Sequence, residues 1–169
     1  MEPQTITTTN TKDAAIFEQR PPKRRLRGDE LLDHIGGRTL GVLATVSADG
    51  YPHLSTVIYA WDPDARLIRI STRANRAKAK NAARDPHAAL FVEGPDTWSF
   101  VVAEGDVELS PQSTEPGDDT GRELLGIFPQ DDATAEADFL AEQVAEQRVV
   151  IRLRANRLYG DIIELSSPS

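Results

Sequence analysis

One short basic segment of the sequence is suited to binding an anion. Residues 71–86 read STRANRAKAKNAARDP, and from Arg66 to Arg84 there are seven Lys or Arg and no Asp or Glu. The whole chain is acidic, with 27 Asp or Glu against 19 Lys or Arg and a net charge of -8. A purely basic segment in such a chain is typical either of a local anion site or of a solvated helix face.

The residues around this segment favour a phosphate site. Ser71 and Thr72 end a predicted strand and lead into a predicted helix at Ala74–Arg84, which is rich in Ala, Lys and Arg. Backbone N–H groups at the start of a helix, with hydroxyls beside them, are a natural site for phosphate. Arg76 and Lys78 lie early in this helix and could add ionic contacts. The cations fall on two faces of the helix, so they cannot all hold one phosphate.

A second candidate site is the predicted strand HLSTVIYAW at residues 53–61. It carries two small hydroxyls, Ser55 and Thr56, among apolar residues. A flat aromatic ring can lie against such a strand while backbone groups bond to its edge. An ordinary strand with one polar face would show the same pattern.

Other kinds of catalytic site are not indicated. The three histidines, His34, His53 and His87, are far apart in the sequence, so no metal site is predicted. The sequence has no Cys, which excludes disulfides and thiolate chemistry. It also lacks the nucleophile elbow of hydrolases, the Walker phosphate loop and the dinucleotide-binding glycine pattern.

The elements that must position these residues are mostly strands. Connections of two to four residues imply antiparallel neighbours, and Ala48-Asp49-Gly50 is a hairpin signal. Strands are predicted at 39–47, 53–61, 66–72, 88–93, 98–109 (bending at Gly105), 149–154 and 157–165, and helices at 28–37, 74–84, 121–127 and 134–147. This order predicts a mainly β (α+β) fold: a small antiparallel barrel with peripheral helices.

The chain is predicted to contain one domain. Residues 1–27 lack hydrophobic periodicity, so we expect a flexible N-terminal arm followed by a domain at 28–169. No apolar run approaches the roughly 18 residues of a membrane span, and no signal peptide opens the sequence, so we expect a cytoplasmic protein. The net acidity argues against a nucleic-acid partner.

Several segments, in order, resemble a known superfamily. They are GVLATVSADGYPHLS, the R-A-K-x-x-N helix, WSFVVAEG and RVVIRL followed by RLYG. From about Leu31 to Gly160 the chain resembles the pyridoxamine 5'-phosphate oxidase-like, FMN-binding split-barrel superfamily. It is most similar to the B group of flavin/deazaflavin oxidoreductases of actinobacteria, which use coenzyme F-420. The resemblance implies a homodimer of six-stranded antiparallel split barrels, with two cofactors bound between the subunits.

The resemblance also implies which residues bind the cofactor. Four residues match phosphate-binding positions of the family: Ser71, Arg76, Lys78 and Asn81. The strand around His53, Leu54, Ser55, Thr56 and Val57 would line the ring, and Trp98 matches an aromatic residue near the pocket. Further cations such as Arg73 and Lys80 suit coenzyme F-420, whose tail carries several carboxylates beyond its phosphate, whereas FMN has only the phosphate.

The implied activity is hydride transfer from the reduced deazaflavin to a conjugated, electron-poor small molecule, such as a biliverdin-like tetrapyrrole or a compound of the quinone or lactone type. Because the cofactor itself supplies the reacting group, no catalytic residue needs to appear as a motif, and none can be named. Two alternatives remain open: an FMN-dependent oxidase or reductase on the same fold, and a non-catalytic protein that binds a flavin or a tetrapyrrole. The expected partners are a second copy of the chain and a small-molecule substrate, not a membrane.

Overall fold

The computed structural model describes residues 22–95 and 98–163, so most of the predicted arm lies outside the described residues. The described chain forms strands β1 (Lys23–Arg25), β2 (Leu40–Val46), β3 (Pro52–Ile58), β4 (Ala60–Asp62), β5 (Leu67–Arg73), β6 (His87–Glu93), β7 (Ser99–Leu109) and β8 (Arg148–Ile163). Its helices are α2 (Asp29–Gly36), α3 (Ala77–Arg84), α4 (Asp119–Ile127) and α5 (Ala133–Ala145). None of the helices in the described ranges is long and apolar enough to span a membrane.

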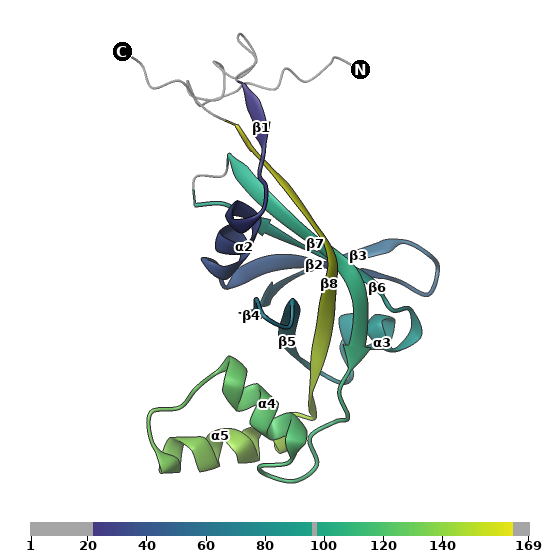
Figure 1. Ribbon diagram of the computed structural model, residues 1–169. Coiled ribbons are helices and arrows are strands. Elements are labelled where there is room, and N and C mark those ends of the chain that lie inside the picture. The colour runs from purple at the N-terminus through teal and green to yellow at the C-terminus, as the bar shows by residue number, and fades with distance from the viewer. Residues whose placement is uncertain (1–21, 96–97, 164–169) are drawn as a thin grey trace, which may run out of the picture.

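The strands form one antiparallel sheet in the order β3-β2-β6-β7-β8-β5-β4, and β1 pairs with the far end of β8. The sheet curls into a half-barrel (Figure 1). β3 lies at one end of this order, yet it comes close to β5 near the other end without pairing with it. The open side of the half-barrel therefore lies between β3 and β5.

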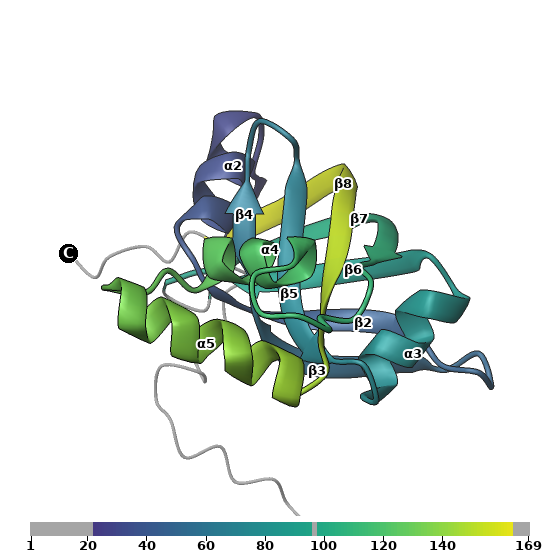
Figure 2. The ribbon, with the colours of Figure 1, turned by 90° about the horizontal axis from the view of Figure 1, so that it is seen from below.

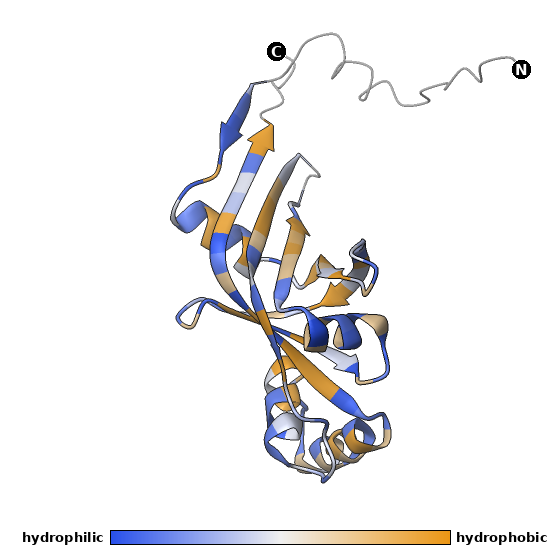
Figure 3. Ribbon diagram, turned by 90° about the vertical axis from the view of Figure 1, so that its right-hand side faces the viewer, coloured by the Kyte–Doolittle hydropathy of each residue, from blue (hydrophilic) through white to orange (hydrophobic). Residues whose placement is uncertain are grey.

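The mainly antiparallel β fold with peripheral helices is confirmed, and its six long strands are those that the sequence pattern predicts. The three-residue strand β1 was not predicted, and the predicted strand at 53–61 is divided at Tyr59 into β3 and the three-residue strand β4. β1 reads Lys-Arg-Arg and is hydrophilic throughout, whereas hydrophobic residues are concentrated in the longer strands (Figure 3). Its pairing with β8 places Lys23–Arg25, the last part of the predicted arm, on the sheet.

The last two predicted strands are one strand, β8, so the prediction of a break between them was wrong. The β7–β8 register skips a residue beside Gly105, which leaves Asn156 unmatched. A Cβ at Gly105 would lie 1.7 Å from the backbone oxygen of Arg154. Only glycine permits this close approach, and the bulge lets both long strands bend without ending.

The core fills the inside of the curl. It contains fully buried aliphatic residues from the helix before the sheet and from most strands, among them Ile35, Leu43, Ile68, Ile70, Leu90, Val92, Ile151 and Leu153. Helix α2 covers one end of this core, and Tyr59 fixes it there. The buried Tyr59 hydroxyl donates a hydrogen bond to the backbone oxygen of Ile35 at 2.6 Å, and burial raises the pKa of this tyrosine.

Replacing Tyr59 with phenylalanine is expected to destabilise the fold. The substitution leaves the buried carbonyl of Ile35 without its donor, which costs about 1–3 kcal/mol of unfolding free energy. Urea denaturation followed by circular dichroism measures the change. Tyr51→Phe is the control, because Tyr51 is 71% exposed and should unfold with the parent; equal losses in both variants would contradict the role given to the Tyr59 hydroxyl.

Candidate functional site

A groove of about 470 Å³ lies at the open side of the half-barrel, and it brings the two predicted candidate sites together. Three segments that are distant in sequence form it: β3, the β5–α3 region, and the α4–α5 pair with the start of β8. Figure 2 shows α4 and α5 across this end of the half-barrel. The residues that line the groove are Thr56, Val57, Ile58, Ser71, Lys78, Phe128, Phe139, Glu142, Gln143, Glu146 and Arg148.

One part of the groove is apolar. The rings of Phe128 and Phe139 lie with their centroids 6.4 Å apart, and Ile58 faces the same space from β3. β3 is the last strand at its end of the described sheet, so one edge of its backbone is not paired with a strand there. An apolar wall beside a free strand edge can hold a flat ring and offer hydrogen bonds to its rim.

The other part of the groove is charged. Lys78 and Ser71 both face it, as the sequence predicted for a phosphate site. Burial, together with the charge of Arg76, lowers the pKa of Lys78 below its ordinary value. No carboxylate in the described parts of the chain forms an ion pair with Lys78. A partly buried ammonium without a counterion marks a place where an anionic ligand would be favoured.

The start of α3 adds backbone donors to this charged part. Arg76 is the N-cap residue of α3, and none of the described side chains caps the helix. The N–H of Ala79 bonds to the backbone oxygen of Arg76 at 3.1 Å, whereas the N–H groups of Ala77 and Lys78 have no partner among the described residues and are open to a ligand oxygen. The Arg76 side chain is exposed and lies outside the groove lining, beside Lys78.

Asn81, which was predicted to bind the phosphate, and Thr72, which was predicted to lie beside it, are also outside the groove lining. Asn81 is buried, where its Nδ2 donates to Thr45 Oγ1 at 3.1 Å and its Oδ1 accepts from Arg84 Nη2 at 3.0 Å. Thr72 is only 4% exposed and points into the core. Asn81 therefore ties α3 to β2, and neither residue lines the groove.

The residues of β3 that were predicted to line the ring lie on both faces of the strand. Val57 lines the groove together with Thr56, whereas His53, Ser55 and Leu54 do not. His53 Nδ1 and Ser55 Oγ are buried without a hydrogen-bond partner among the described residues. Leu54 is 64% exposed on the outer face of the sheet.

Trp98 lies far from the groove. It directly precedes β7, and its backbone oxygen accepts a hydrogen bond from Ile163 at 2.8 Å. Ile163 ends β8, whereas Arg148 in the groove begins it. Trp98 and the groove of the same chain therefore lie at opposite ends of β8.

Seven residues that line the groove were not predicted from the sequence: Ile58, Phe128, Phe139, Glu142, Gln143, Glu146 and Arg148. Arg148 Nη1 donates to Ser71 Oγ at 3.3 Å, and its Nε donates to Glu146 at 2.7 Å. Glu146 also accepts a hydrogen bond from Arg73. For Glu146 and Arg148 the sequence does contain a signal, because these two opposite charges flank the junction between α5 and β8.

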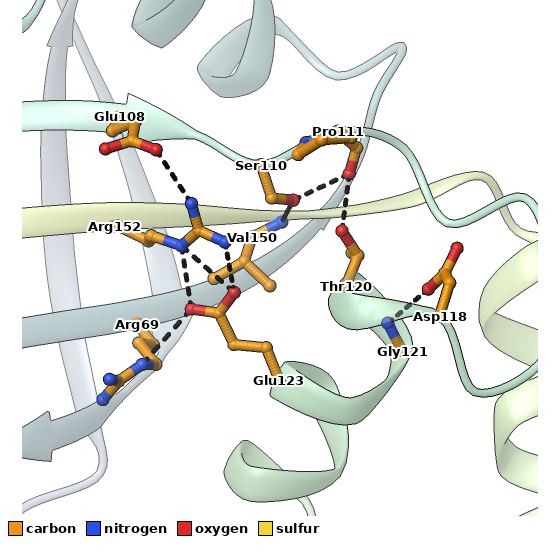
Figure 4. Close-up of polar contacts among 10 residues, drawn as sticks. All are labelled: Arg69, Glu108, Ser110, Pro111, Asp118, Thr120, Gly121, Glu123, Val150 and Arg152. Atoms are coloured by element: carbon orange, nitrogen blue, oxygen red, sulfur yellow. Dashed lines mark hydrogen bonds and ion pairs between the residues drawn. The ribbon is translucent and has the colours of Figure 1, made fainter.

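The α4–α5 pair is held against the half-barrel by a second ion network (Figure 4). The Glu123 carboxylate of α4 accepts from Arg152 Nη2 at 2.6 Å and from Arg69 Nε at 3.2 Å. Arg152 also pairs with Glu108 of β7 at 2.9 Å. Asp118 caps α4 by accepting from the backbone N–H of Gly121 at 2.7 Å. These contacts fix the wall that carries Phe128 and the start of α5.

Replacing Glu123 with glutamine is expected to loosen this wall. The two arginines lose their shared, largely buried counterion, which should lower the unfolding free energy by about 1–3 kcal/mol. Hydrogen exchange should speed up in α4 and α5 more than in the central strands. Glu136→Gln on the exposed face of α5 is the control; uniform exchange in both variants would contradict this assignment.

Residues 28–160 match the sequence model of the pyridoxamine 5'-phosphate oxidase family. The chain belongs to this family. A 70-residue stretch is 36% identical to a biliverdin reductase of Mycobacterium tuberculosis (strain CDC 1551 / Oshkosh) that depends on reduced coenzyme F-420. That match covers 41% of this chain and 51% of the relative, so it spans about half the length of the curated protein.

Solved structures share the fold. A conserved hypothetical protein of Mycobacterium tuberculosis is 25% identical, with a TM-score of 0.63, over 85% of this chain and 93% of the other. An F-420 reductase is also 25% identical, with a TM-score of 0.54, over 75% of this chain and 94% of the other. Proteins of this family are named for coenzyme F-420 or for FMN. The chain is thus a distant homologue of F-420-dependent reductases.

Proposed function

We propose that this protein is a coenzyme F-420-dependent reductase that acts on a conjugated, unsaturated small molecule. The observation that carries the proposal is the groove itself, which joins an apolar wall to a charged end where Lys78 has no counterion among the described residues. A cofactor with a flat ring and an anionic chain fits both ends. The relatives named for coenzyme F-420 support the deazaflavin over FMN.

Each part of the groove would have its own task. Ser71, Lys78 and the open N–H groups of α3 would hold the phosphate. The free backbone edge of β3 at Thr56–Ile58 would bond to the rim of the ring, and Phe128 and Phe139 would keep water from it. When bound, the reduced cofactor supplies a hydride at C5 of its ring. The protein then needs to bind and orient the two reactants rather than to provide a nucleophile.

We further propose that the cofactor lies between two copies of the chain. The outer face of the sheet exposes large apolar side chains on neighbouring strands, among them Leu40, Leu54, Ile58, Phe91 and Tyr159. The register places Leu40 opposite Ile58 and connects Phe91 to Tyr159 through Val102, so these residues share one face. Such a face is typical of a homodimer interface. Because Ile58 belongs both to this face and to the groove, a second subunit on the face would border the cofactor.

Trp98 is consistent with this arrangement. It matches an aromatic position near the family's pocket, but it lies at the end of β8 opposite to Arg148. Within one subunit it cannot reach the groove, whereas the Trp98 of a second subunit could. The natural substrates to test are biliverdin-like tetrapyrroles and compounds of the quinone or lactone type.

Fluorescence titration of the purified protein with oxidised coenzyme F-420, and separately with FMN, tests the proposed cofactor. We expect saturable binding of the deazaflavin and weaker binding of FMN. The loaded, reduced protein should then oxidise its cofactor only when a suitable unsaturated compound is added. Tighter binding of FMN would overturn the cofactor assignment and favour the FMN enzyme, and binding without turnover of any candidate would favour a carrier.

A further inference from the structure

The charged end of the groove contains a carboxylate that an anion site would not be expected to have. Glu146 is the C-cap residue of α5 and lines the groove. Its carboxylate accepts from Arg73 through one oxygen and from Arg148 Nε, at 2.7 Å, through the other. These two hydrogen bonds hold the pKa of Glu146 below its ordinary value, so the group is ionised at neutral pH. One carboxylate thus occupies two guanidinium groups.

These arginines continue directly from the proposed phosphate site. Arg148 reaches back to Ser71 Oγ with Nη1 while Nε and Nη2 hold Glu146. Lys78, Ser71 and Arg148 line the same groove. Arg73 lies outside its lining but is joined to Arg148 through Glu146. Guanidinium groups bind a carboxylate of a ligand with the same geometry as a carboxylate of the chain.

We propose that Arg73 and Arg148 form a second anion subsite, for carboxylates in the tail of the bound cofactor, and that Glu146 is a competitor built into the chain, which the tail displaces. This inference rests on the proposed function, because it takes a ligand with carboxylates beyond its phosphate. The side chain of Glu146 is 22% exposed, so it can turn toward solvent without burying its charge. Displacement then exchanges one pair of charge-assisted hydrogen bonds for another.

A purely structural role for Glu146 predicts the opposite change in ligand affinity when its charge is removed. If Glu146 serves only to hold Arg73 and Arg148 in place, removing its charge loosens both arginines and weakens ligand binding. If Glu146 competes with the ligand, removing its charge frees both arginines and strengthens binding. The two roles can therefore be separated by one isosteric substitution.

The test compares Glu146→Gln with Glu142→Gln. Glu142 also lines the groove, about one helical turn earlier, and forms no ion pair with a described residue. Both variants lose one negative charge from the same groove. We expect Glu146→Gln to bind oxidised coenzyme F-420 with a multi-glutamate tail about tenfold more tightly than the parent, because each freed guanidinium gains a charged partner. Glu142→Gln should gain less than about threefold, the modest effect of a nearby charge. FMN, which has no tail, should respond equally to both substitutions.

Two results would overturn the inference: unchanged or weaker binding by Glu146→Gln, or equal gains for the two variants. Failure of the proposed function is seen separately, in the parent protein, as preference for FMN or binding of neither cofactor. In that case a γ-linked triglutamate peptide is titrated as a probe of the subsite alone. Tighter peptide binding by Glu146→Gln than by Glu142→Gln supports the subsite, and no difference overturns it. Circular dichroism of both variants checks that the fold is retained.

Discussion

Lys78→Ala is expected to weaken the binding of oxidised coenzyme F-420 by about 10- to 100-fold at neutral pH. A hydrogen bond to a charged group contributes about 1.5–3 kcal/mol, and each 1.4 kcal/mol changes affinity about tenfold. Lys78 is the cation of α3 that faces the groove, and no described carboxylate forms an ion pair with it. The same fluorescence titration that tests the cofactor measures this loss.

Lys80→Ala provides the matched control for this prediction. Lys80 lies two residues further along the same helix, is exposed, and does not line the groove. Its removal lowers the net charge equally but should change affinity less than about threefold. Similar losses in the two variants would mean that the helix attracts the cofactor only through its overall charge.

The pH dependence of binding gives an independent check on Lys78. The pKa of the Lys78 ammonium is below its ordinary value, chiefly because of burial. The ammonium form binds the anion and the neutral amine does not, so affinity of the parent should fall as the pH rises through this lowered pKa. The fall should be absent from Lys78→Ala. An identical alkaline fall in parent and variant would assign the effect to another group.

Leu54→Asp is expected to convert the proposed dimer to a monomer in solution. Leu54 is 64% exposed on the outer face of β3, in register with Ala44 of β2. Burying an unpaired carboxylate in an apolar interface costs several kcal/mol, which raises the dimer dissociation constant more than about 100-fold. Sedimentation equilibrium of the parent and the variant measures the change.

The control for the dimer prediction is Ala137→Asp, which adds the same charge to the exposed surface of α5. It should leave the association state unchanged. Cofactor binding is measured on the same samples, because the proposal places the cofactor beside the interface. A monomeric parent protein would overturn the homodimer, and a monomeric variant with full cofactor affinity would separate binding from dimerisation.

The sequence pattern was sufficient to predict the main elements, and the family resemblance implied that the basic segment and the strand at 53–61 share one pocket. The alternation of β3 and β5 is clear, and the helical composition of residues 77–84 is unambiguous. Ser71, Lys78, Thr56 and Val57 line the same groove, although β3 and α3 belong to different parts of the chain. The bend at Gly105 was also predictable, because a glycine inside a long strand commonly marks a bulge.

Other features depend on contacts that a linear pattern does not contain. The acidic region from Asp106 to Glu146 has the composition of a solvated surface, yet Glu123 and Glu146 each hold two arginines. Asn81 has the side chain of a phosphate ligand, but α3 turns it toward Thr45. Helical periodicity alone fixes only relative directions on a helix, and the packing partner decides which face is buried.

The basic and acidic segments of the chain are, in space, each other's counterions. Arg69 pairs with Glu123 and Arg73 with Glu146, across 54 and 73 residues of sequence. The core of the half-barrel consists of buried apolar side chains, and α4 and α5 are also joined to the sheet by these charge pairs. The Arg73 side chain is 42% exposed whereas that of Glu123 is 15% exposed, so added salt screens the Arg73–Glu146 pair more than the pair at Glu123. Rising ionic strength should therefore loosen the attachment of α5 at Glu146 before that of α4 at Glu123.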